Sequence, residues 1–212
     1  MSLGGTNKTI SNMPAYSLAR QRSSRGTTRV LFLRKEGETL QFLSTSQDTR
    51  LEAAEIIFSL PPGGSPPQAH RHVEQSEHVE VLFGEIDLDL EGERRLLREG
   101  EEVTIGAGSI HAFGNASAKQ RAIVRVTFRP ALNIEWYFTQ LACSAIRNGG
   151  SWNGVPLLEW ATIHYAVRRE YRLARIPAPL QDLFFGTLTL MAKITGAVKN
   201  IRPLSLYKAY VK

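Results

Sequence analysis

The alternation of apolar and polar residues between positions 28 and 130 predicts a series of short strands. Residues 85–91 alternate acidic and aliphatic side chains without a break, which is the period of a strand with one face in water and one in the core. Runs rich in Leu, Ile, Val and Phe recur along this region, separated by glycine, proline or acidic turns. The expected strands are 29–34, 39–44, 51–60, 68–73, 85–91, 94–98, 102–105, 109–113 and 121–129. Short strands at this spacing predict a sandwich or a barrel.

After Pro130 the pattern changes to the helical period. Helices are expected at 132–146, 157–176 and 180–198, with breaks at the Gly/Asn-rich segment 148–156 and at the prolines of 177–179. The third helix is strongly apolar, but Asp182 and Lys193 bracket an uncharged run of about ten residues, and a membrane span needs about 20. We therefore expect no membrane span.

The chain of 212 residues is long enough for one hydrophobic core with an appendage. We expect three parts: a polar N-terminal arm (1–27), a β-barrel (28–130), and an α-helical extension (131–212) that packs on the barrel or at a dimer interface. The arm has no apolar run typical of a secretory signal or an anchor, so we expect a cytoplasmic protein. The single cysteine, Cys143, excludes an intramolecular disulfide and a cysteine-rich zinc site.

The net charge of +6 is unevenly distributed. All of the excess lies in residues 131–212, where the basic residues are spread over the predicted helices and form no aromatic-interleaved basic strand. A solvated helix face is the simpler interpretation, and we expect no nucleic-acid partner. The alternative is a tail that binds nucleic acid or anionic lipid, which would be sensitive to salt.

Four residues form a candidate metal site. His70 and His72 are two positions apart, so both imidazoles lie on one strand face, and Glu77 can reach back past a polar turn. Glu74 is a second candidate for the carboxylate. His111 lies in a later strand. Imidazole and carboxylate together favour a divalent first-row metal over calcium or a thiolate-rich structural zinc site.

The strand period also predicts the wall of the pocket beside this site. Val79, Val81 and Phe83 continue the face of Glu77, and Phe113 shares the face of His111, so we expect these four residues to line a substrate pocket. Isolated histidines, His78 and His164, are expected to be exposed or structural. Two weaker sets of residues could also contribute. The arginines of the last strand could bind an anion in the pocket: Arg121, Arg125 and Arg129. Aromatic residues of the tail could cover the mouth of the barrel: Trp136, Tyr137, Phe138, Trp152 and Trp160. The arginines are more often in water, and the aromatic residues are more often core.

The two segments that carry the candidate ligands resemble the motifs of the cupin superfamily. These motifs are G(X)5HXH(X)3–4E(X)6G and G(X)5PXG(X)2H(X)3N, and the chain reads GSPPQAHRHVEQSEHVEVLFG at 64–84 and GEEVTIGAGSIHAFGN at 100–115. Gly106 stands where the family usually has proline. The resemblance implies a mainly β fold, a cupin-type double-stranded β-helix (jelly-roll) barrel, here with a C-terminal α-helical extension. It further implies one divalent transition metal ion (Fe, Mn, Ni, Zn or Cu) held by His70, His72, Glu77 and His111, and pairing into a homodimer.

Three imidazoles and one carboxylate leave one or two coordination positions free, which is typical of a catalytic site. The leading hypothesis is a metal-dependent enzyme that acts on a small, partly apolar organic molecule. Family resemblance favours a dioxygenase, an oxidoreductase. No separate nucleophile or general-base motif is present, so Glu77 is the candidate catalytic residue beside the metal. The alternative is a non-enzymatic cupin that binds a small ligand or acts as a sensor.

Overall fold

The structure of the protein is a computed structural model that describes residues 29–64 and 67–204. The expected N-terminal arm, 1–27, lies outside the described residues. The strands are β1 (Arg29–Leu33), β2 (Glu38–Ser44), β3 (Ala54–Leu60), β4 (His70–His72), β5 (Ser76–Phe83), β6 (Glu85–Leu90), β7 (Glu93–Arg98), β8 (Glu102–Ile105), β9 (His111–Asn115), β10 (Ala122–Arg129) and β11 (Tyr171–Leu173). The helices are α1 (Ile134–Arg147), the short 3-10 helix η1 (Trp152–Gly154), α2 (Leu157–Ala166) and α3 (Ala178–Ile194).

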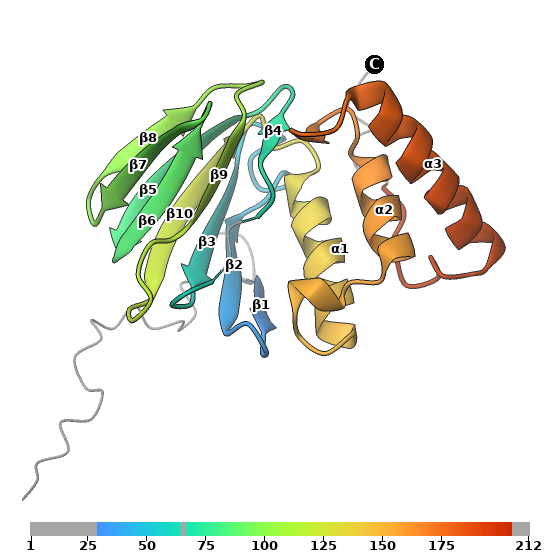
Figure 1. Ribbon diagram of the computed structural model, residues 1–212, viewed down its shortest axis with the longest axis horizontal. Coiled ribbons are helices and arrows are strands. Elements are labelled where there is room, and N and C mark those ends of the chain that lie inside the picture. Colours follow the sequence, from blue (N-terminus) through green and yellow to red (C-terminus); the bar gives the residue numbers. More distant parts are fainter. Residues whose placement is uncertain (1–28, 65–66, 205–212) are drawn as a thin grey trace, which may run out of the picture.

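The strands form two antiparallel sheets (Figure 1). One sheet has the order β1-β2-β3-β10-β5-β8 and the other has the order β11-β4-β9-β6-β7. The three helices follow the barrel strands in the sequence and lie together on one side of them (Figure 1). The expected fold class is therefore confirmed: a mainly β, double-stranded β-helix barrel with a C-terminal helical extension.

Alternation along β5 and β10 explains how these central strands are held. Val79 pairs with Val126 and Val81 with Val124, and all four side chains are buried in the core of the barrel. The outward positions between them are polar, and Arg125 donates to Glu80 at 3.0 Å across the same strand pair. The inward apolar face drives the pairing, because removal of this area from water is the main favourable term in folding.

Two glycines hold the strands that carry the candidate ligands. Gly84, at the end of β5, has φ of +78°, and a Cβ atom there would lie 2.6 Å from the carbonyl oxygen of Arg121. Only glycine fits that position. Gly108 also has positive φ, and its N–H donates to the carbonyl of His72 at 2.7 Å. The turn that precedes β9 is thereby fastened directly to β4.

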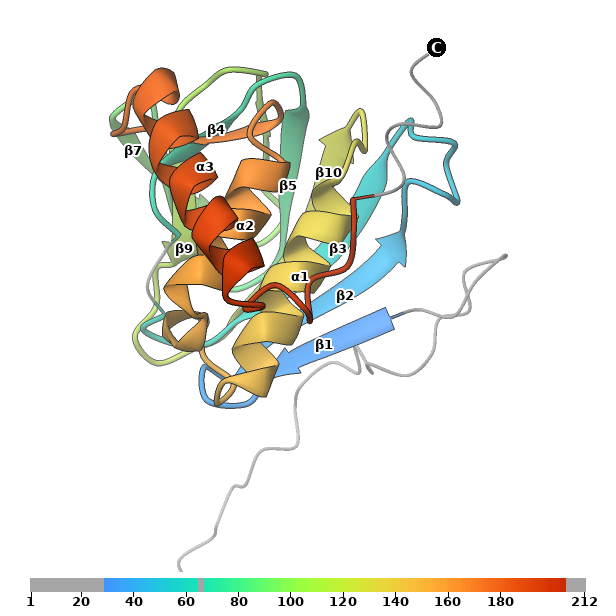
Figure 2. The same ribbon diagram turned by 90° about the vertical axis from the view of Figure 1, so that its right-hand side faces the viewer.

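The helices share a continuous core with the barrel. Phe138 of α1 packs edge-on against Phe58 of β3, with ring centroids 5.2 Å apart, and lies 6.1 Å from Phe128 of β10. Figure 2 shows α1 in front of the strands, with α2 and α3 beside it. At the other edge of α1, Arg29 of β1 donates to Glu135 at 2.9 Å. The extension therefore packs on the barrel within a single chain.

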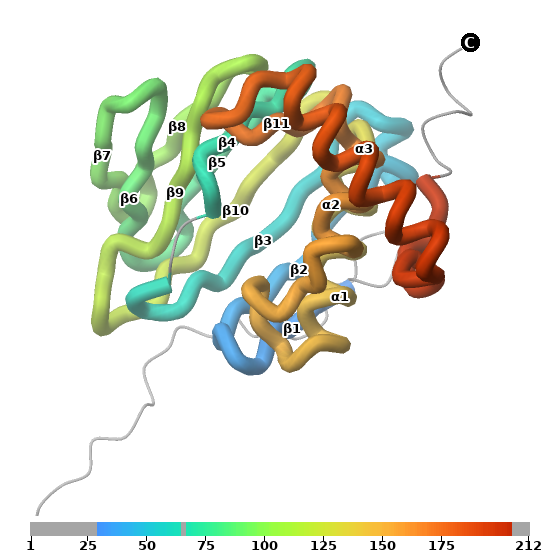
Figure 3. The backbone as a smooth tube through the Cα atoms, turned by 45° about the vertical axis from the view of Figure 1, so that its right-hand side comes forward, coloured from blue at the N-terminus to red at the C-terminus, as the bar shows by residue number. Residues whose placement is uncertain are grey.

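The prediction of a helix through 157–176 is wrong in its second half. Helix α2 ends at Ala166, and β11 then pairs with β4, Tyr171 opposite His72 and Leu173 opposite His70. Figure 3 shows β11 beside β4, far from it in sequence. The segment contains no glycine or proline before Pro177, so local signals favoured a helix. Pairing with the free edge of β4 outweighs that preference.

Among the described residues, no helix has both the length and the apolar character that a membrane crossing requires.

Candidate metal centre

The fold brings together the four residues expected to bind metal. His70 of β4 lies opposite His111 of β9 in the sheet register, and Glu77 approaches from β5 in the other sheet. One potential ligand atom from each of His70, His72, Glu77 and His111 lies within 4.8 Å of the others. All four side chains are at most 7% exposed. The cluster is therefore a closed group of donors between the two sheets.

Backbone carbonyls orient two of the imidazoles. Nδ1 of His70 lies 3.0 Å from the carbonyl oxygen of Gln68, and Nδ1 of His111 lies 3.0 Å from that of Ser109. A carbonyl can only accept, so Nδ1 carries the proton in both rings. Nε2 of His70 is left with a lone pair, which is the form in which imidazole binds a metal. Nε2 of His111 faces the Glu77 carboxylate and must be without a proton before it can bind a metal.

The third imidazole is oriented by Gln75, which the sequence analysis did not single out. The side-chain nitrogen of Gln75 donates at 2.9 Å to the carbonyls of both Pro130 and Ala131. Its oxygen therefore faces His72 and accepts from Nδ1 at 3.2 Å. Gln75 is 1% exposed. Gln75 can be recognised as part of the site because it is a polar residue buried between candidate ligands. Motif spacing alone does not reveal burial.

Glu77 lies at the centre of the group. One of its carboxylate oxygens lies 2.9 Å from Nε2 of His111 and 3.2 Å from Nε2 of His72. Burial alone would raise the pKa of Glu77, but hydrogen bonds from the two histidines outweigh it and hold that pKa below its usual range. Burial and the neighbouring imidazoles lower the pKa of His70 to about 3. An ionised carboxylate and a neutral imidazole are the forms that bind a divalent cation.

The other candidates near the centre point away from it. Glu74 is exposed, so the carboxylate of the group comes from Glu77. His78 lies on the outer face of β5, where Nδ1 is 3.0 Å from the hydroxyl of Thr104. Arg121 donates to the carbonyls of Gly37 and Ser59 and does not line the cavity.

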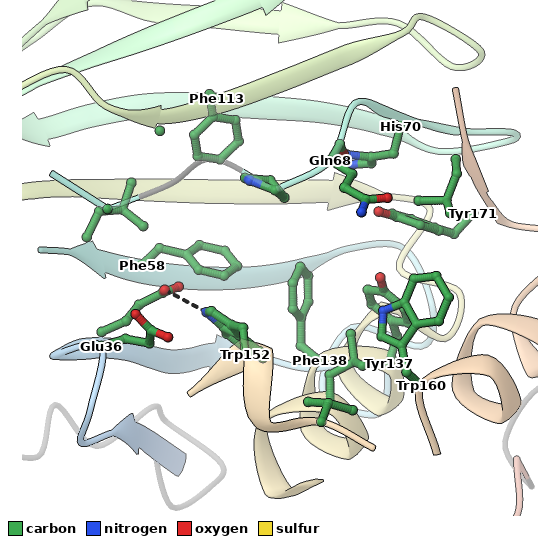
Figure 4. A pocket seen from close by; sticks show the side chains of 18 of the residues that line it. Glu36, Phe58, Gln68, His70, Phe113, Tyr137, Phe138, Trp152, Trp160 and Tyr171 are labelled. Atoms are coloured by element: carbon green, nitrogen blue, oxygen red, sulfur yellow. Dashed lines mark hydrogen bonds between the residues drawn. The ribbon is translucent and has the colours of Figure 1, made fainter. Parts of the chain in front are cut away.

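A cavity of about 420 Å³ extends from the cluster towards the helices (Figure 4). The barrel contributes Phe58, Phe113 and Phe128 to its wall. The extension contributes most of the other aromatic residues: Tyr137, Phe138, Trp152, Trp160 and Tyr171. An apolar wall with polar groups at defined points is typical of sites for small organic ligands.

This wall differs from the expected one. Of the four residues predicted to line the pocket, Phe113 does so, whereas Val79, Val81 and Phe83 are not among the lining residues. Both valines face inward as expected, but they are buried in the barrel core, and Phe83 lies at the end of β5. The reason is that α1, η1 and α2 pack over the space between the sheets and enclose the cavity on their own side.

Two carboxylates lie in the cavity wall on β2 and the turn before it. The hydroxyl of Ser151 donates to Glu36 at 2.5 Å, and the indole N–H of Trp152 donates to Glu38 at 2.8 Å. Burial, partly offset by the Trp152 hydrogen bond, raises the pKa of Glu38 to about 7. No signal in the sequence pointed to this pair, because the segment that bears it reads as the start of an ordinary apolar strand.

Comparison with known proteins identifies the barrel. The profile of the cupin domain family Cupin_2 matches residues 56–128. No curated protein matches the chain. Similar solved structures include an RmlC-like cupin from Shewanella frigidimarina (20% identity, TM-score 0.41, covering 49% of this chain and 85% of that one). Another is the Cupin_2 domain of an XRE family transcriptional regulator from Enterobacter cloacae (25% identity, TM-score 0.38, covering 43% and 95%). A third is KdgF from Halomonas sp. (18% identity, TM-score 0.39, covering 44% and 79%).

The matched segment begins in β3, ends in β10 and contains all four residues of the buried cluster. Residues 56–128 therefore form a cupin domain, and a helical extension follows it.

Proposed function

We propose that the protein is a metal-dependent enzyme that acts on a small, partly apolar organic molecule, with a dioxygenase as the leading reaction class. One observation carries the proposal: three imidazoles and one carboxylate converge at one end of an aromatic cavity of about 420 Å³. A structural metal site needs no such space beside it. The donor set suits one divalent transition metal ion (Fe, Mn, Ni, Zn or Cu) and leaves positions open for a substrate.

A bound metal would supply Lewis acidity or, if it is iron, manganese, nickel or copper, redox chemistry. The protein supplies the environment. His70, His72 and His111 present fixed Nε2 atoms, the aromatic wall excludes water, and Glu77 is the candidate catalytic residue. Its carboxylate is ionised and lies between two imidazoles, so it is placed to accept a proton from a substrate group beside it.

The metal assignment is tested by elemental analysis of the purified protein. We expect about one transition metal ion per chain, and we expect His72→Ala to lose it, because the Glu77 contact and the Gln75 hydrogen bond meet at that imidazole. His78→Ala is the matched control, since His78 lies on the same barrel but faces outward. Full metal stoichiometry in His72→Ala would contradict the assignment.

The reaction class is tested by oxygen consumption of the iron-loaded protein against a panel of phenolic and diketone substrates. Substrate-dependent uptake that is lost in His72→Ala supports an oxygenase. The alternative function is that of a non-enzymatic cupin that binds a small ligand or acts as a sensor. Tight binding of a panel compound without turnover, by protein loaded with each candidate metal in turn, would favour that alternative.

We also propose that the protein is a cytoplasmic homodimer that pairs through α3. Leu183, Leu190 and Ile194 recur at helical spacing on that helix and are 68%, 60% and 77% exposed. An apolar face of this kind is typical of contacts between subunits. We expect Ile194→Lys to convert a dimer to a monomer in sedimentation equilibrium. A monomeric wild-type protein at micromolar concentration would contradict the proposal.

A further inference from the structure

Two carboxylates lie in the cavity wall away from the metal cluster. Glu36 belongs to the turn before β2, Glu38 is the first residue of β2, and both residues are partly buried. Figure 4 shows Glu36 next to Trp152, on the opposite side of the cavity from His70. Burial, and to a smaller extent the charge of Glu36, raise the pKa of Glu38. The two carboxylates therefore form one acidic end of the cavity.

Each of these carboxylates keeps one oxygen free. The hydroxyl of Ser151 donates to Oε1 of Glu36, and the indole N–H of Trp152 donates to Oε2 of Glu38. No described residue donates to the other oxygen of either group. Neither carboxylate takes part in an ion pair with a described residue. The acidic end therefore has two unused acceptor atoms, Oε2 of Glu36 and Oε1 of Glu38.

Arg121 is the cation whose charge acts on the acidic end. It lowers the pKa of Glu38, but its Nη1 donates at 2.9 Å to the carbonyl of Gly37 and at 3.1 Å to that of Ser59. The guanidinium group does not line the cavity, and the described residues that do line it include no lysine or arginine. A buried charge without a partner is costly, so a cation that enters the cavity would stabilise this end.

Aromatic rings surround the acidic end. Figure 4 shows Phe58 and Trp152 on the same side of the cavity as Glu36, with Phe138 beside them. The rings of Phe58 and Phe138 meet edge to face with centroids 5.2 Å apart, and the hydrogen bond to Glu38 fixes the indole of Trp152. The faces of such rings attract cations and apolar groups. The rings therefore favour the same ligand charge as the carboxylates and disfavour an anion.

We propose that the cavity selects a primary amine with an apolar body, whose ammonium group binds to Glu36 and Glu38 while the body extends along the aromatic wall towards the metal cluster. A primary ammonium group carries three donors, which suits the two free carboxylate oxygens and a face of Trp152. Glu36 and Glu38 act as specificity residues. The inference rests on the proposed function only in that the cavity binds a small organic molecule.

Three small probes test the selection: 2-phenylethylamine, 2-phenylethanol and phenylacetate. They share a phenyl ring on a short chain and end in an ammonium, a hydroxyl and a carboxylate group. Binding is followed by amide and indole chemical shifts of ¹⁵N-labelled protein at pH 8, above the pKa of about 7 of Glu38. The protein is first stripped with a chelator, because an amine or a carboxylate can bind a metal ion directly.

We expect the amine to bind about tenfold more tightly than either other probe, which is the lower end of what hydrogen bonds between charged groups contribute. The indole N–H signal of Trp152 should shift on binding of the amine, because that group donates to Glu38. A shift confined to residues outside the cavity would place the amine elsewhere and overturn the proposal.

Two variants test the carboxylates, and a third is their control. Glu36→Gln and Glu38→Gln remove the charge but keep an oxygen that accepts from Ser151 or Trp152. We expect each to lose about threefold or more of the preference for the amine over the alcohol, a ratio that a loss of stability alone does not change. Glu80→Gln should keep the full preference, because Glu80 pairs with Arg125 and does not line the cavity.

Equal affinities for the three probes, no binding of any probe, or an unchanged preference in both Glu36→Gln and Glu38→Gln would each overturn the proposal. Failure of the proposed function is distinguishable from these outcomes. If the protein takes up no metal but stripped protein still prefers the amine, the metal assignment fails and the ligand class stands. If zinc binds stoichiometrically but the probes are not distinguished, the ligand class fails and the metal assignment stands.

Discussion

The two ends of the cavity are built in different ways. The metal end is made by strands whose backbone ladders fix the side chains in register, as in the pairing of His70 with His111. The opposite wall is made largely by the extension, where Tyr137, Phe138 and Trp160 are held by the packing of α1 and α2 against the barrel and against each other. Strand β11 connects the two ends, since it pairs with β4 and places Tyr171 against His70.

The two ends of the cavity meet different requirements. Binding of an ion needs donors placed to within a few tenths of an ångström, which a sheet register and hydrogen bonds that orient the ligand rings can provide. Recognition of a ligand needs a wall whose shape and polarity can vary, which helices packed on a rigid barrel can provide. We therefore expect changes in the extension to alter stability and ligand choice while the metal site stays intact.

The largest effect is expected from a cavity in the extension. Phe185 of α3 is 3% exposed and packs edge-on against Trp160 of α2 with centroids 5.1 Å apart. We expect Phe185→Ala to lower the free energy of unfolding by about 3–5 kcal/mol, measured by urea denaturation, with unchanged metal stoichiometry. Leu157→Ala, at a 57% exposed position at the start of α2, should change it by less than about 0.5 kcal/mol. Loss of metal from folded Phe185→Ala would show that the two ends are not separable.

A smaller effect, confined to the metal end, is expected from Gln75→Leu. The change removes the acceptor that fixes Nδ1 of His72 and leaves the carbonyls of Pro130 and Ala131 without that donor. We expect zinc affinity to fall by about 10–100-fold, measured by competition with a chelating dye. An unaltered zinc affinity would remove Gln75 from the metal site.

The metal end could be predicted from the sequence because its ligands and turns are marked by residues close together in the chain. The strand period placed His70 and His72 on one face, and the glycines at 64, 84, 100 and 108 marked the turns between strands, which is enough to indicate the fold. Gln75 could not be found in this way. Its role depends on Pro130 and Ala131, more than 50 residues away, and that proximity exists only after the barrel closes.

The opposite wall could not be predicted because it depends on contacts between distant segments. Tyr171 lies in a stretch with no helix-breaking residue, so the sequence predicts a helix there. In the structure it belongs to a strand, because it pairs with β4, about 100 residues earlier. The sequence likewise presented His164 as an isolated histidine and Val79 and Val81 as pocket wall. An inward side chain can border a cavity or fill a core, depending on which elements pack above it. In this protein those elements are α1 and η1.

The smallest predicted effect lies in the pH dependence of stability at the helical end. Folded His164 resists protonation until about pH 4, whereas in the unfolded chain it takes up a proton near its ordinary pKa of 6.5. Between these values the unfolded state binds more protons, so the contribution of His164 to stability falls as the pH is lowered from 6.5 towards 4. From pH 7 to 5.5 this amounts to about 1 kcal/mol. His164→Gln cannot titrate, so its free energy of unfolding, measured by urea denaturation at both pH values, should fall by about 1 kcal/mol less than that of the wild type. The metal ligands are present in both proteins, so the difference between the two changes isolates the helical end. Equal changes would mean that His164 takes up its proton as readily in the folded protein as in the unfolded chain, in which case its Nε2 would donate to Tyr137 at pH 5.5.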